Sequence, residues 1–209
     1  MTDDEVAAVH EAAHAVFAVF GRWTKLAGPV VLRGPGHGDV VMSTDAEAIG
    51  RTLGRDPRFD RELPRIQLVR ALLAGPTAER ILADRGLADL SDEDLSDVSR
   101  GDYAVVAEQL GELKPPRPDL LDRLEREVRR RLEQPAIWLA VERFAAVLLE
   151  RRSLGAEEAT AILGEIGKGA GIELPADSPK PNPWRILLAA FLLLGGVVGL
   201  GIFLGASAR

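Results

Sequence analysis

The N-terminal region carries a long apolar run. From Val6 to Phe20 nearly every position is apolar, apart from three polar residues near its centre. Thr2 and Glu5 have the spacing of a capping box, and Gly21 is a typical helix stop. Because a helix that is apolar all round is buried on every side, the pattern predicts a buried helix between Thr2 and Gly21.

Short strands and several amphipathic helices are predicted beyond this helix. The first strand should be followed by a turn-rich loop at 33–39, and a polar surface segment should follow the second. In chain order, the expected elements are strands at 23–32 and 40–42, a flexible segment at 45–61, helices at 64–82, 101–113, 119–132, 136–152 and 157–166, and an acidic loop at 84–100. Asp119 is expected to cap the helix at 119–132, and Pro135 to start the helix at 136–152.

The helical pattern at 64–82 contains one interruption. Gly75 is followed by Pro76, which cannot donate a hydrogen bond to the carbonyl of Leu72 and crowds that group. We therefore expect a kink or break at this point. The predicted fold class is mainly α (α+β), with a small β hairpin.

The C-terminal end has a different composition. Four prolines occur within residues 173–183, which is typical of an extended linker. Residues 186–206 contain no charged side chain and are long enough to cross a bilayer as a helix, with Trp184 and Arg185 as interface anchors. The predicted organisation is a domain at 1–168, a linker at 169–184 and one transmembrane helix at 185–207.

The orientation of this single-pass anchor can be predicted from its flanking charges. Lys180 and Arg185 precede it, whereas Arg209 alone follows it. The positive-inside tendency and the acidic start of the chain favour a cytoplasmic domain. Gly195 with Gly199, and Gly201 with Gly205, have a spacing that allows close packing of two membrane helices. Assembly of the chain into a homo-oligomer through the anchor is therefore one hypothesis.

Composition excludes some classes of site. The chain of 209 residues has a formal net charge of −6 and no basic run, which argues against a nucleic-acid partner. It contains no cysteine, so disulfides and cysteine-ligated zinc are excluded.

The polar residues inside the first helix form an HExxH motif. His10 and His14 lie one turn apart on one helical face, where both imidazoles can reach one metal ion, usually zinc. Glu11 is placed to accept a proton as a general base. The alternative is a pair of core histidines hydrogen-bonded to their neighbours. His37, the third histidine, falls in the 33–39 loop, where a solvated role is expected and contact with the site is the alternative.

The order of several short motifs is similar to that in a known family. The motifs are His10–His14, a strand ending at 30–34, the stretch Leu72–Glu79, an aspartate at a helix start, and the stretch Leu148–Leu154. Over about residues 5–166 the chain resembles the peptidase domain of FtsH-type zinc proteases.

The resemblance implies a set of site residues. The family binds zinc through both HExxH histidines and an aspartate from a distant helix start. Here Asp102 fits that position best, and Asp97 is the runner-up. Glu79 matches a glutamate that could orient a zinc-bound histidine. Without the resemblance, the aspartate could be a helix cap and Glu79 an exposed salt-bridge partner.

The chain also departs from the family. It has no glycine-rich loop followed by Lys-Ser or Lys-Thr, so the family's ATPase module is absent from it. Ala13 and Pro76 replace residues typical of the family, and the predicted anchor is C-terminal rather than N-terminal.

The expected function is that of a membrane-anchored zinc metalloendopeptidase with Glu11 as general base. Its substrates would be peptides or flexible protein segments, unless a separate ATPase delivers folded ones. The strand ending at Leu32 could pair with an extended substrate. The alternative is a catalytically inactive, zinc-stabilised membrane adaptor that binds a protein partner.

Overall fold

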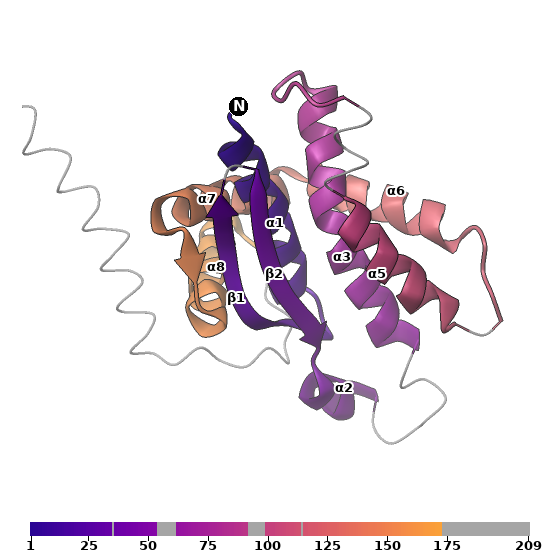
Figure 1. The fold of residues 1–209 in the computed structure, drawn as a ribbon. Helices are drawn as coiled ribbons and strands as arrows, with labels where there is room; N and C mark the ends of the chain where they lie inside the picture. Colours follow the sequence, from indigo (N-terminus) through magenta and orange to yellow (C-terminus); the bar gives the residue numbers. More distant parts are fainter. Residues whose placement is uncertain (35, 54–61, 92–98, 114, 173–209) are drawn as a thin grey trace, which may run out of the picture.

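The computed structural model describes residues 1–34, 36–53, 62–91, 99–113 and 115–172 (Figure 1). These residues form seven helices and one three-stranded antiparallel sheet, so the predicted mainly helical class is confirmed. In chain order, the elements are α1 (Asp3–Val19), β1 (Thr24–Gly34), β2 (His37–Thr44), α2 (Ala46–Leu53), α3 (Glu62–Asp84), α5 (Arg100–Gly111), α6 (Leu120–Leu132), α7 (Pro135–Arg151), β3 (Ser153–Leu154) and α8 (Ala156–Ala170).

The predicted buried helix is α1, and it lies at the centre of the fold. Every residue from Val6 to Val19 is buried. The sheet packs against one face of α1. Helices α7 and α8 lie on one side of α1, and α3 lies on the other side (Figure 1). Its N-terminus has the expected capping box, in which Thr2 Oγ1 accepts from the backbone N–H of Glu5.

The predicted hairpin is longer than expected and has a third strand beside it. Pairing of β1 with β2 continues to Gly34 and His37, because Gly36 adopts a φ of +71° and turns the chain tightly. The predicted loop at 33–39 is therefore wrong. The two-residue strand β3 pairs with Val30 and Val31 of β1, and a strand this short has no sequence signal.

Helix α3 runs without a break through the predicted interruption. It includes Pro76, and the hydroxyl of Thr77 donates to the carbonyl of Leu73 at 2.6 Å. Of the expected kink or break, the break is wrong because neighbouring elements bury this turn of the helix, so packing outweighs the loss of one backbone donor.

The polar segment at 45–61 begins with a helix rather than a flexible stretch. The Asp45 carboxylate accepts from the backbone N–H groups of Glu47 and Ala48 and so caps α2. Residues 54–61 lie outside the described residues.

The C-terminal helices match their predicted positions, with small differences. Pro135 opens α7 as expected, whereas the side chain of Asp119 makes no capping hydrogen bond at α6. Helix α8 continues to Ala170, two residues into the predicted linker.

None of the described helices is both long enough and apolar enough to cross a membrane. The predicted anchor at 186–206 and most of the linker lie outside the described residues, so the anchor stays a prediction.

Candidate metal centre

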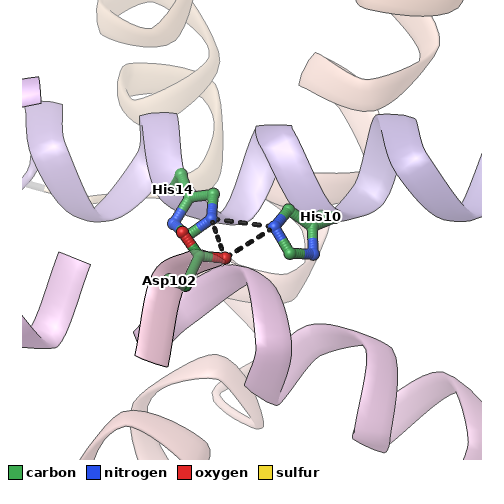
Figure 2. A group of neighbouring side chains, drawn as sticks. All are labelled: His10, His14 and Asp102. Carbon is green, nitrogen blue, oxygen red and sulfur yellow. Dashed lines mark hydrogen bonds and ion pairs between the residues drawn. The ribbon is translucent and has the colours of Figure 1, made fainter. Parts of the chain in front are cut away.

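Three side-chain atoms from two helices converge beside α1. His10 and His14 come from α1, and Asp102 comes from the first turn of α5 (Figure 2). The Nε2 atoms of His10 and His14 are 2.9 Å apart. Asp102 Oδ2 lies 3.2 Å from His10 Nε2 and 3.3 Å from His14 Nε2. Ligands about 2.0–2.1 Å from one tetrahedral zinc ion would lie about 3.3 Å apart. The three residues could therefore hold a metal ion.

Outer contacts fix the orientation of both imidazoles. His14 Nδ1 lies 2.7 Å from the carbonyl oxygen of Ala71, which can only accept, so Nδ1 must donate. His10 Nδ1 lies 2.8 Å from Oε1 of Glu79, and Ser99 donates to the other oxygen of that carboxylate at 3.3 Å. Both Nε2 lone pairs are thereby directed at the cluster, as metal ligation requires.

The cluster of His10, His14 and Asp102 is stabilised by positive charge at its centre. With both Nδ1 atoms donating outward, two Nε2 lone pairs and one carboxylate oxygen face one another. Burial lowers the pKa of His10, but its hydrogen bonds to Asp102 and Glu79, with the charges of Glu79 and Glu11, raise it to about 10. Burial raises the pKa of Asp102, but both histidines hold it well below its usual range. Either a proton or a metal cation would satisfy the site.

Gly75 leaves the space that this cluster uses. A Cβ atom at this position would lie 2.4 Å from His14 Nε2 and 2.5 Å from His10 Nε2. Only glycine therefore lets α3 pass over the two imidazoles. The sequence signal was visible, since a glycine inside a buried helical pattern usually marks a close approach. It predicted only an interruption of the helix, however, and the contact was missed.

Glu11 directly follows the ligand candidate His10, and its buried side chain packs against β2. A Cβ atom at Gly38 would lie 2.5 Å from Glu11 Cγ, so glycine is needed there too. None of the described residues forms a hydrogen bond with the carboxylate of Glu11. Burial raises its pKa, the two histidines lower it, and the charges of Asp102 and Asp39 raise it, so that the net shift is upward. A carboxyl with a raised pKa is suited to proton transfer near neutral pH.

A cleft of about 520 Å³, which we call the metal cleft, opens onto these groups. The exposed His37 lies on its lining, and Val40 and Met42 of β2 form part of its wall. Glu11, the three cluster residues and Glu79 line it as well. The cleft is therefore lined both by ionisable side chains and by strand β2.

The expectation that the strand ending at Leu32 could pair with a substrate is wrong. That strand, β1, is the central strand of the sheet, because β2 and β3 occupy its two sides. The backbone N–H of Leu32 donates to the carbonyl of Arg152 at 2.8 Å. Among the described strands, β2 has one unpaired edge, and it is β2 that lines the metal cleft.

The alternatives left open for two residues can now be decided. Ser99 occupies the N-cap position of α5, so Asp102 is not the helix cap. Glu79 is 2 % exposed, so it is not a surface salt-bridge partner. Asp97, the runner-up ligand, lies outside the described residues.

No family model matches this chain, and a search of curated proteins found no match to its sequence.

Proposed function

We propose that residues 1–168 are an FtsH-like zinc peptidase domain and that the chain is a membrane-anchored metalloendopeptidase. The observation that carries this proposal is the convergence of His10, His14 and Asp102, with the outer nitrogens of both histidines already held. Two imidazoles and one carboxylate form a ligand set that suits zinc, and three protein ligands leave one position open. When bound there, zinc would polarise a peptide carbonyl and make water a stronger nucleophile at neutral pH.

Glu11 would carry the protons of the reaction. Its carboxylate would take one proton from the attacking water as the new C–O bond forms. It would then give that proton to the amine nitrogen as the peptide C–N bond breaks. Its lack of a competing hydrogen bond among the described residues, and its raised pKa, support this role.

The unpaired edge of β2 is suited to hold the substrate. An extended peptide could lie antiparallel to β2 and bind through backbone hydrogen bonds, with little demand on its sequence. This edge replaces the strand at Leu32 in the predicted mode of binding. Because the chain has no ATPase module, we propose flexible or unfolded segments as substrates, or delivery by a separate ATPase.

One feature of the cluster also favours the second candidate, an inactive zinc-stabilised adaptor. The ligands and their outer contacts join α1, α3 and α5, so a bound ion would fasten three helices together. A purely structural site has no need for a buried carboxyl such as Glu11 beside it, which is why we prefer the peptidase.

Cleavage by the full-length chain in detergent tests the choice between the two functions. The substrate would be a fluorescently labelled unfolded protein, and zinc content would be measured on the same samples. We expect Glu11→Gln to keep its zinc and to lose activity by about 10²-fold or more. Glu108→Gln, an exposed change on α5, is the matched control and should retain full activity.

Zinc-loaded wild type that cuts no unfolded substrate would favour the adaptor. Equal activity of wild type and Glu11→Gln would remove the proposed base.

A further inference from the structure

A second hollow, of about 600 Å³, is lined by residues of α1, α3, α6, α7 and the end of α8. It shares no lining residue with the metal cleft. Its charged lining consists of Arg70, Arg130 and Arg131 against the single carboxylate of Glu127. We call it the arginine hollow, and it plays no part in the proposed peptidase function.

The one carboxylate in the arginine hollow is already engaged. Glu127 Oε2 accepts two hydrogen bonds from the same guanidinium, from Arg70 Nη2 at 2.6 Å and from Arg70 Nε at 3.2 Å. The other oxygen of Glu127 lies 3.7 Å from Arg123. None of the described carboxylates forms an ion pair with Arg130 or Arg131, so positive charge is in excess there.

Arg131 is held in place by contacts that do not neutralise it. Its Nη2 donates to the backbone carbonyl of Phe20 at 3.2 Å, and its guanidinium lies 5.3 Å from the centre of the Phe17 ring. Burial, together with the nearby charge of Arg70, holds the pKa of Arg131 below its usual value. A guanidinium has five N–H donors, so most of those of Arg131 remain available to a ligand.

The start of α7 lines the same hollow. Gln134 is the N-cap residue of this helix of 17 residues, and its side chain makes no capping hydrogen bond. The first backbone N–H groups of a helix have no acceptor within the helix, and they favour anions. Ala136 and Ile137 of this first turn are part of the lining, beside the arginines.

We propose that the arginine hollow binds a phosphate group, carried either by a soluble phosphate monoester or by the headgroup of an anionic lipid. Guanidinium groups bind phosphate oxygens in pairs, and a phosphate monoester carries about two negative charges, which would balance the excess. The hollow has the volume of a small-molecule site. Gly171 and Ile172 also line it, and they directly precede the part of the sequence that contains the predicted linker and anchor, which is why a lipid headgroup is the second source.

Thermal unfolding of the full-length chain in detergent tests the soluble source. Inorganic phosphate would be added at constant ionic strength, balanced with chloride. It should raise the Tm of the wild type, and the double variant Arg130→Gln/Arg131→Gln should bind about tenfold or more weakly. Arg130→Gln alone, at an exposed position, guards against a folding defect and should also bind more weakly. Arg126→Gln, on the exposed side of α6, removes the same single charge and is its matched control.

Hydrogen exchange in nanodiscs tests the lipid source. The chain would be placed in phosphatidylcholine alone or in phosphatidylcholine mixed with phosphatidic acid. Protection of the first turn of α7 only with phosphatidic acid, lost in the double variant and kept in Arg126→Gln, would support a lipid headgroup. No effect of phosphate and no protection by phosphatidic acid would overturn the proposal. Equal losses in Arg126→Gln and in Arg130→Gln, each of which removes one positive charge, would also overturn it, because binding would then reflect net charge alone.

Discussion

The metal cleft collects acceptors around His10, His14 and Asp102, whereas the arginine hollow collects donors around Arg130 and Arg131. The two histidines are buried and held by outer contacts to Glu79 and to the carbonyl of Ala71, and Asp102 is partly buried. The arginines are half-buried or exposed. Excess negative and excess positive charge thus lie in separate hollows, and the first is far more rigidly organised. We therefore expect changes around the metal cleft to have large effects and changes around the arginine hollow to have smaller ones.

The largest effect should come from filling the space over the imidazoles. Gly75→Ala would put a methyl group 2.4 Å from His14 Nε2 and 2.5 Å from His10 Nε2, so the helices or the ligands must move. We expect nearly complete loss of zinc, measured by mass spectrometry, with a destabilisation of about 1–3 kcal/mol from overpacking.

Gly50→Ala is the control for this substitution, because a Cβ atom at position 50 of α2 meets nothing within 4 Å. Normal zinc content in Gly75→Ala would show that the close approach of α3 does not matter for the site.

A smaller effect should come from removing the carboxylate behind His10. Glu79→Gln keeps the size of the side chain but weakens the 2.8 Å contact that orients His10 Nδ1. Loss of such an outer contact typically costs about 10–100-fold in metal affinity. Competition with a chromogenic chelator would measure it, and an unchanged affinity would mean that His10 needs no orienting carboxylate.

The contact behind Glu79 should matter less again. Ser99→Ala removes the 3.3 Å hydrogen bond to the second oxygen of Glu79 but leaves the carboxylate in place. The same competition assay should show a decrease of only a few fold, in line with about 0.5–1.5 kcal/mol for one hydrogen bond. A loss as large as that of Glu79→Gln would show that Ser99 helps to fix the whole α3–α5 contact.

The smallest effects should be those of substitutions in the arginine hollow on zinc affinity and of substitutions in the metal cleft on phosphate binding. The two hollows share no lining residue, so Arg130→Gln/Arg131→Gln should leave zinc affinity unchanged and Asp102→Asn should leave the response to phosphate unchanged. Zinc and phosphate titrations of both variants would measure this. A change of tenfold or more in either cross-test would mean that the sites are coupled through α1 or α3.

Sequence patterns predicted the two regions unequally, for physical reasons. His10 and His14 are four residues apart, so helix periodicity alone brings them together. Asp102 lies far along the chain, and only the resemblance to a family pointed to it. The arginine hollow had no signal at all, because Arg70 and Arg131 meet through the packing of α3 against α6.

The fold shows the same division between local and long-range information. The capping box at Thr2 and the opening of α7 at Pro135 depend on neighbouring residues, and both were predicted. Strand β3 depends on pairing with Val30 and Val31 far away in the sequence, and it was missed. The continuity of α3 through Pro76 depends on burial by other elements, and the local rule could not predict it.

The metal content of the full-length chain tests the central claim most directly. Zinc would be counted in the wild type, His14→Ala and Asp102→Asn, with Asp122→Asn as a matched control at an exposed position in the first turn of α6. The account predicts about one zinc per chain in the wild type and in Asp122→Asn, and a loss in the other two. A wild type that resists zinc loading, or an Asp102→Asn variant that keeps full zinc affinity, would contradict it.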